Sequence, residues 1–210
     1  MEKRPLFPLH TVLFPGGMLP LRIFEQRYLD MIRRGTDQGN GFVVTLIERG
    51  KEVGEIPQVY PVGTYSEVAD FKTLPDGLLG IVVQGLYRVD LGSVVPSEQI
   101  QGLAEAVAIR RPENEGIPLP ERYSGLGSLL RTAMTELQDK GVIESGAGII
   151  PTLPDFNSAE QVAWRLAELL PLDAGSRQNI LAIDDPIVRL EQIEELIRRI
   201  GRDPGLTRPN

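Results

Sequence analysis

The chain has 210 residues, with 22 lysines and arginines against 29 aspartates and glutamates, which gives a net charge of −7. Cysteine is absent and His10 is the single histidine, which excludes thiol catalysis, disulfide scaffolds, iron–sulfur clusters and zinc sites built on Cys or paired His. The acidic balance disfavours nucleic-acid binding, because most of that affinity comes from Lys and Arg contacts to phosphate. We therefore expect an acidic globular protein without metal or cofactor.

Targeting signals are not evident in the sequence. The first residues lack the apolar stretch of a secretory signal, and no apolar run is long enough to span a membrane, so we expect a cytoplasmic protein. The net charge is −1 over residues 1–111 and −6 over residues 112–210, and the hydrophobic period changes at the same place. We predict a β-barrel subdomain over 1–111, a helical bundle over 112–202 and a flexible tail over 203–210.

One helix is predicted within the first subdomain, from about Arg22 to Arg34. Gly35 would end it in the left-handed conformation that glycine adopts readily, and Arg33 and Arg34 would then lie where the helix dipole favours positive charge. Apolar side chains recur on one face at helical spacing and predict a buried stripe. The stripe consists of Phe24, Tyr28, Met31 and Ile32.

The rest of this subdomain has short apolar runs separated by glycine and proline, a pattern typical of β-strands. Alternating polar and apolar residues indicate antiparallel strands with one buried face. The predicted strands cover residues 42–47, 62–68, 78–83, 86–91 and 103–109. A turn at Pro75, Asp76 and Gly77 joins the second strand to the third, and Gly85 indicates a bulge or sharp bend. Together these signals predict a barrel-like sheet.

A linker is predicted over residues 111–120, and the pattern then changes to a helical period. Helices are predicted along residues 126–137, from Ser158 to a stop at Pro171, over 173–182, and from the Asp185-Pro186 cap onward. Residues 141–157 form a long loop. Four successive helices predict a compact bundle.

Catalytic motifs are missing. Glu52 follows Gly50-Lys51 where a phosphate loop needs Ser or Thr, and no serine lies in a Gly-x-Ser-x-Gly elbow. The lysines stand in polar contexts, although a lysine base must be buried to lower its pKa. They are Lys3, Lys51, Lys72 and Lys140. We interpret His10 as structural and Trp164 as a packing residue, and we predict no catalytic residue.

Residues 5–28 resemble the start of the N-terminal substrate-binding domain of the Lon protease family. Further segments agree in order, at residues 41–44, 52–54, 62–68, 75–77 and 85–89. The resemblance implies an α+β fold: a PUA-like antiparallel β pseudo-barrel with an inserted helix, followed by a C-terminal helical bundle. It also implies recognition of unfolded or tagged polypeptides. Because the ATPase and protease modules of Lon have no counterpart in this sequence, we expect a non-enzymatic recognition protein, with Lon protease as a potential partner.

The candidate binding residues lie near the apolar loop at residues 14–20. Exposed aromatic and Met side chains on a constrained loop would offer an adaptable surface for varied peptides. The predicted site comprises Phe14, Met18, Leu19, Arg22 and Glu25. The alternative is that the apolar members plug the barrel end and that Glu25 pairs with Arg22 or Arg27. An open sheet edge that accepts an extended peptide as an added strand is a further route.

Two other functions remain open at this point. The PUA-like resemblance allows RNA binding, for which Arg22, Arg27, Arg33 and Arg34 would supply a local basic cluster. A small-molecule enzyme that uses carboxylates in a cleft between the halves would need buried Asp or Glu side chains with raised pKa values.

Overall fold

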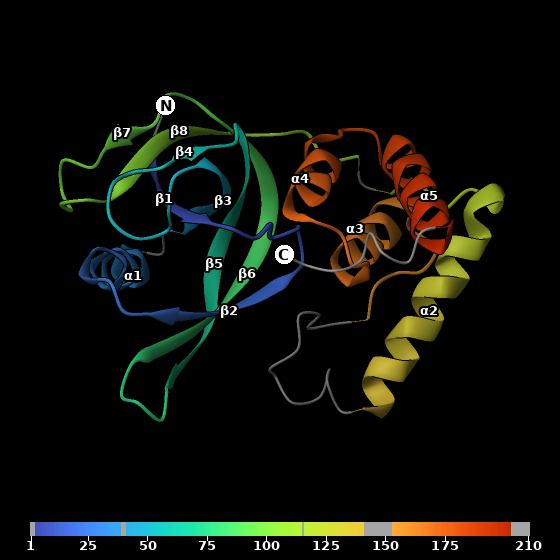
Figure 1. The fold of residues 1–210 in the computed structure, drawn as a ribbon, viewed down its shortest axis with the longest axis horizontal. Helices are drawn as coiled ribbons and strands as arrows, with labels where there is room; N and C mark the ends of the chain where they lie inside the picture. The colour runs from blue at the N-terminus through green and yellow to red at the C-terminus, as the bar shows by residue number, and fades with distance from the viewer. Residues whose placement is uncertain (1–2, 39–40, 115, 141–152, 203–210) are drawn as a thin grey trace. The chain divides into compact units, whose positions relative to one another are not determined.

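The computed structural model describes residues 3–38, 41–114, 116–140 and 153–202 (Figure 1). The chain divides into two compact units, Met1–Arg111 and Pro112–Asn210, and the boundary lies where the sequence changes character. The predicted tail over 203–210 and most of the predicted loop over 141–157 lie outside the described residues. In the part of the chain that is described, no helix has the length and apolar character needed to cross a membrane.

The first unit is a mixed sheet with one helix. Its elements are β1 (Lys3–Leu9), β2 (Met18–Ile23), α1 (Gln26–Gln38), β3 (Phe42–Arg49), β4 (Gln58–Val59), β5 (Val62–Thr73), β6 (Leu79–Leu91), β7 (Val95–Pro96) and β8 (Ala104–Arg110). The strand order is β2-β6-β5-β3-β1-β8-β7, and β4 pairs with β3. An additional pairing of β6 with β8 closes the central strands into a barrel.

The barrel differs from the predicted antiparallel sheet in one pairing. β1 and β3 run parallel, with Leu6 opposite Val43, whereas the other strand pairs are antiparallel. A parallel pair needs a long crossover between its strands. The segment that contains β2 and α1 supplies it, so the inserted helix and the parallel pairing have the same cause.

Two hydrophobic clusters fill the first unit, and β1 contributes to both because successive side chains of a strand point to opposite faces. Phe7 and Leu9 belong to the larger cluster, which we call the main hydrophobic cluster and which contains the α1 residues Tyr28 and Met31. The Phe7 and Tyr28 rings stack with their centres 4.1 Å apart. Leu6 belongs to the other cluster. Helix α1 is therefore held on the barrel by aromatic and aliphatic packing.

The predicted start of the helix is wrong by four residues. Residues 18–23 form β2, in which Arg22 lies opposite Gly80 and Ile23 opposite Leu79, so pairing with β6 overrides the local helical pattern. Phe24 follows the strand and is 59 % exposed, which removes it from the predicted buried stripe. The other stripe members, Tyr28, Met31 and Ile32, are buried as predicted.

The predicted end of the helix is also wrong. Helix α1 continues through Gly35 to Gln38, so Arg33 and Arg34 lie before its last turn and do not cap it. Arg34 instead reaches the segment before β8, where its Nη1 donates to Gln99 Oε1 at 2.9 Å. A tertiary contact therefore replaces the local role predicted for this arginine.

The two strands predicted over 78–83 and 86–91 are one strand, β6, and Gly85 lies within it. The pairing of β5 with β6 shifts register opposite Gly85, which confirms the predicted bulge. A Cβ atom at this position would lie 2.5 Å from the Phe14 carbonyl oxygen, and Gly16 N donates to Gly85 O at 2.7 Å. Glycine is needed here because the 14–17 loop rests directly on the strand. The turn at Pro75, Asp76 and Gly77 joins β5 to β6 as predicted.

The second unit contains η1 (Glu121–Tyr123), α2 (Ser124–Asp139), α3 (Ala159–Leu169), α4 (Ala174–Ala182) and α5 (Pro186–Arg202). The two predicted N-caps are confirmed, since Ser158 accepts from Gln161 N and Asp185 accepts from Ile187 N. The helix predicted over 173–182 is also capped, because Asp173 accepts from Ser176 N. Trp164 is buried as a packing residue, and the Arg189 guanidinium lies 3.7 Å from the centre of its ring.

Candidate functional site

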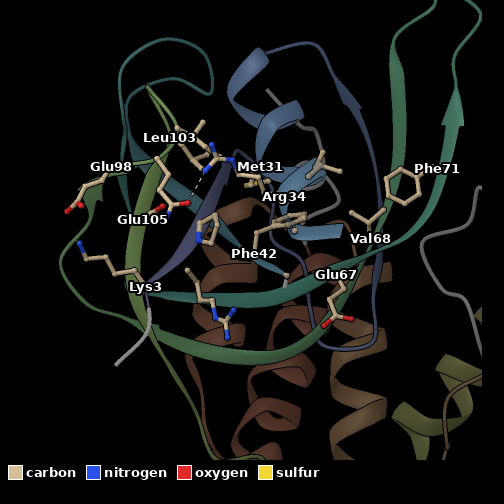
Figure 2. Close-up of a pocket in the computed structure, with 17 residues that line it drawn as sticks. Lys3, Met31, Arg34, Phe42, Glu67, Val68, Phe71, Glu98, Leu103 and Glu105 are labelled. Atoms are coloured by element: carbon tan, nitrogen blue, oxygen red, sulfur yellow. Dashed lines mark hydrogen bonds between the residues drawn. The ribbon is translucent and has the colours of Figure 1, made fainter. Parts of the chain in front are cut away.

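The first unit contains a cavity of about 550 Å³ between helix α1 and strand β5 (Figure 2), which we call the α1–β5 cavity. Its volume lies in the range of pockets that hold small-molecule ligands or several side chains. The lining comes from the start of β1, residues 31–35 of α1, the start of β3, the middle of β5 and the segment from residue 98 to β8. The lining residues are Lys3, Arg4, Pro5, Met31, Ile32, Arg34, Gly35, Gly41, Phe42, Glu67, Val68, Phe71, Glu98, Gln99, Ile100, Leu103 and Glu105.

The inner surface of the α1–β5 cavity is apolar. Met31, Ile32 and Phe42 belong to the main hydrophobic cluster, together with Ile100 and Leu103. Because these side chains are packed into the core behind them, they form a fixed wall rather than a surface that could collapse into the opening. Such a wall favours apolar side chains of a ligand.

Phe71 extends the apolar surface outward at the mouth of the cavity. It lies on β5 beyond Val68 and is 47 % exposed. Figure 2 shows Glu67, Val68 and Phe71 on one side of the opening, and Lys3, Glu98 and Glu105 on the other. A large aromatic side chain exposed beside an apolar pocket is typical of a binding surface.

The rim of the α1–β5 cavity carries charges of both signs in equal number. The basic side chains are Lys3, Arg4 and Arg34, and the acidic ones are Glu67, Glu98 and Glu105. Two of these are held in place, since Arg34 donates to Gln99 at 2.9 Å and Glu105 accepts from Ser97 Oγ at 2.6 Å. The rim therefore does not favour a ligand that carries many charges of one sign.

Gly41 fixes the corner of the cavity where β3 begins. Its N–H donates to Tyr65 Oη at 2.8 Å, and a Cβ at this position would collide with the Ser66 carbonyl oxygen. The backbone of β3 is thereby held against β5 as far as Ser66. Beyond that residue β5 is no longer paired with β3, and the cavity occupies the resulting gap.

A second cavity of about 210 Å³ lies near the end of β2. It is lined by Phe7, Pro8, Leu9, Pro20, Leu21, Arg22, Ile23, Phe24, Glu25, Tyr28 and Glu52. Two of the predicted site residues, Arg22 and Glu25, therefore lie at one opening. Phe24 is the exposed aromatic residue of this smaller cavity.

The apolar members of the predicted site are placed differently. Phe14 is fully buried and offers no surface, because the 14–17 loop is bonded to Gly85 and the Leu13 carbonyl accepts from Thr64 Oγ1 at 2.5 Å. Leu19 packs on the main hydrophobic cluster from strand β2, and Met18 lies half-buried at the start of the same strand. None of the predicted site residues lines the α1–β5 cavity.

The sequence contained one signal for the α1–β5 cavity. Phe71 lies between the charged residues Asp70 and Lys72, and a large aromatic side chain is not expected in a hairpin that is surrounded by water. The predicted strand ended at Val68, so this residue fell outside it. The remaining lining comes from segments that only the tertiary fold brings together.

Arg27 connects the smaller cavity to the loops around it. The side chain is 8 % exposed, its Nη1 donates to the carbonyl oxygens of Gly54 at 3.0 Å and Gly102 at 2.7 Å, and its Nη2 donates to Glu52 O at 3.0 Å. Nη2 also lies 2.9 Å from Glu25 Oε2, so Glu25 forms the pair with Arg27 that the alternative interpretation predicted. Burial raises the pKa of the neighbouring Tyr28 to about 12. These contacts of Arg27 hold the backbone around the smaller cavity in place.

The second unit contains carboxyl groups with raised pKa values, which is the sign expected of an acid–base enzyme. Burial raises the pKa of Glu168 to about 8 although Arg165 lies 2.8 Å away, and burial with a hydrogen bond to Glu113 raises the pKa of Glu160 to about 7. Neither residue lines either cavity described above.

The described residues give no support to the other enzymatic candidates. Over residues 3–38, 41–114, 116–140 and 153–202, no group of three or more His, Cys, Asp or Glu side chains could hold a metal ion. His10 is exposed, and its backbone N–H donates to Glu52 Oε1 at 2.7 Å. All four lysines are exposed, whereas a lysine that acts as a base is typically buried.

Comparison with known proteins gives the family. A family model described as the ATP-dependent protease La (LON) substrate-binding domain matches residues 3–199. The chain belongs to this Lon substrate-binding family. The crystal structure of a Lon N-terminal domain protein from Xanthomonas campestris is 31 % identical, with a TM-score of 0.74, and the match covers 93 % of this chain and 98 % of that one. This likeness confirms the predicted α+β fold.

More distant members of the Lon family match most of the chain. The N-terminal domain of the Mycobacterium avium complex Lon protease has a TM-score of 0.62 at 15 % identity, a level that shows the fold alone, and the match covers 92 % of this chain and 97 % of that one. The Lon protease of Trichlorobacter lovleyi is 26 % identical over 210 residues, which cover 94 % of this chain but 24 % of that protease. The chain thus spans about a quarter of the length of this curated relative.

Proposed function

We propose that this protein recognises unfolded polypeptides without catalysing a reaction on them, and that the α1–β5 cavity is its binding site. The observation that carries the proposal is a fixed apolar wall open to solvent beside the exposed Phe71, in a domain of the Lon substrate-binding family. Unfolded chains differ from folded ones in exposing large apolar side chains, and this cavity can enclose them.

The charges at the rim favour polypeptide over nucleic acid. Glu67, Glu98 and Glu105 stand at the same opening as the basic side chains, so a phosphate backbone would meet repulsion as well as attraction. A polypeptide with charges of both signs is neither attracted nor repelled overall by the charges of the rim. The RNA-binding alternative predicts binding that weakens steeply with added salt, whereas apolar recognition predicts binding that salt changes little.

The family also supports a functional link to Lon protease. The proposal is that the protein holds polypeptide in the cytoplasm, either presenting it to Lon or competing with Lon for it. Degradation of an unfolded substrate by purified Lon, with and without this chain, separates the two roles: presentation accelerates degradation and competition slows it. An unchanged rate at saturating chain would argue against any link to Lon.

The binding site is tested with two matched exposed phenylalanines. Phe71 lies at the α1–β5 cavity and is 47 % exposed, whereas Phe24 lies at the smaller cavity and is 59 % exposed. Because about half of each side chain is in water, substitution by aspartate should leave the fold intact. We expect Phe71→Asp to weaken binding of a fluorescent, permanently unfolded polypeptide about tenfold or more, and Phe24→Asp to change it less than about twofold.

The opposite ranking would move the site to the smaller cavity, where Arg22 and Glu25 lie with Phe24. Equal binding by both variants and the unaltered chain would remove both cavities from the proposal. Absence of saturable binding to any unfolded polypeptide would end the proposed function itself.

A further inference from the structure

One edge of β5 is free along the α1–β5 cavity. β6 pairs with β5 from Val62 to Thr73, whereas β3 pairs only as far as Ser66. Within the described ranges, no strand pairs with the second edge of β5 over residues 67–73. Glu67, Val68 and Phe71 from this stretch line the cavity (Figure 2), so backbone hydrogen-bonding groups and a side-chain pocket lie next to each other.

The register shows which backbone groups face this free edge. Leu74 N donates to Leu78 O at 2.9 Å. From there back to Phe71, which lies opposite Ile81, β5 and β6 pair without a shift in register. Hydrogen-bonded and non-hydrogen-bonded pairs alternate along an antiparallel ladder. Phe71 and Thr73 therefore direct their N–H and C=O groups away from β6.

The hydrogen bond made by Phe71 N–H agrees with this assignment. It donates to Asp70 Oδ1 at 2.8 Å and thus not to β6. One of the N–H groups that point away from β6, that of Phe71, is therefore already bonded to the Asp70 carboxylate. The Phe71 carbonyl and both backbone groups of Thr73 are left to face a new partner.

The edge formed by β2 is less suited to accept a strand. Just before β2, Gly17 O accepts from Gly85 N of β6 at 3.0 Å. By the same alternation, Pro20 of β2 directs its backbone away from β6. Proline has no N–H to donate, and its position on an outer strand is typical of edges that resist added strands.

We propose that an extended segment of unfolded polypeptide binds as an added strand on β5 at Phe71–Thr73 and directs an aromatic or large aliphatic side chain into the α1–β5 cavity. This inference rests on the proposed function and specifies how its ligand is held. The evenly mixed charges of the rim select against a strongly charged segment, so the occupant is an apolar stretch with few charges. Backbone pairing requires no particular sequence, which suits a protein that must hold many unfolded chains.

The test changes the ligand first, so that folding of the protein is not in question. The probe is a short fluorescent peptide with a central phenylalanine, compared with two versions in which alternate backbone nitrogens are methylated along one edge or the other. Methylation of the paired edge should raise Kd about tenfold, because hydrogen bonds are lost, and methylation of the opposite edge should change it less than about twofold.

The matching change in the protein is Thr73→Pro, which removes the outward N–H, with Thr73→Ala as the control that keeps it. We expect Thr73→Pro to weaken binding about fivefold and Thr73→Ala to leave it nearly unchanged. If both methylated peptides bind as the parent does while Phe71→Asp still weakens binding, the added strand is wrong and the proposed function stands. If no peptide and no unfolded polypeptide binds, both fail.

Discussion

Arg27 gives the sharpest test of how the first unit is stabilised. Its guanidinium donates to the carbonyl oxygens of Glu52, Gly54 and Gly102 and pairs with Glu25, and the whole side chain is 8 % exposed. These contacts join α1 to the loop before β4 and to the turn before β8. Replacement by methionine keeps most of the aliphatic stem and removes every polar contact.

The size of the effect follows from these contacts. Each hydrogen bond from a charged donor contributes about 1.5 kcal/mol or more, but the carbonyls of the exposed residues Gly54 and Gly102 can bind water once the guanidinium is gone. We therefore expect Arg27→Met to lower the free energy of unfolding by about 3 kcal/mol. Arg27→Lys keeps the charge beside Glu25 but cannot reach three carbonyls at once, so we expect a loss of about 2 kcal/mol.

The assay is urea unfolding followed by circular dichroism, with Arg22→Met as the control. Arg22 forms an ion pair with Asp76, and its side chain is 60 % exposed, so its loss should change the free energy of unfolding by less than about 1 kcal/mol. If Arg27→Met and Arg22→Met gave the same small loss, the argument from the buried hydrogen bonds would be refuted.

Two further changes test other parts of the structure. Burial and the hydrogen bond with Glu113 raise the pKa of Glu160 from 4.5 to about 7. Between these two pH values the folded chain keeps a proton that the unfolded chain releases. The free energy of unfolding should therefore fall as pH rises through this range. Glu160→Gln should flatten that fall by about 1 kcal/mol in urea titrations at several pH values; an unchanged slope would contradict the shift. Gly85→Ala should lower the free energy of unfolding by about 2 kcal/mol, because its Cβ would lie 2.5 Å from Phe14 O, and thermal unfolding within a degree of the unaltered chain would contradict this.

Predictions from the sequence succeeded where the signal is local. The caps at Ser158, Asp173 and Asp185 act on amides within three residues, so the sequence alone placed the starts of three helices. The bulge at Gly85 was also predictable, because glycine within a strand indicates close approach of other backbone.

Predictions failed where the partner is distant in sequence. Strand β2 pairs with β6 about sixty residues away, Leu19 lying opposite Val83, and no local pattern encodes that contact. The predicted helix therefore took in Arg22 and Phe24, and the predicted site included Phe14, which the bonded loop buries. The α1–β5 cavity draws its lining from five segments of the chain, so it could not be recognised before the fold was known.

The central claim is that unfolded polypeptide binds at the α1–β5 cavity, and amide hydrogen exchange with and without such a ligand tests it most directly. The account predicts slower exchange over residues 67–73 and 98–103, on the two sides of the opening, with little change around the smaller cavity near Arg22. Protection confined to the second unit, or to residues 20–25, would contradict it.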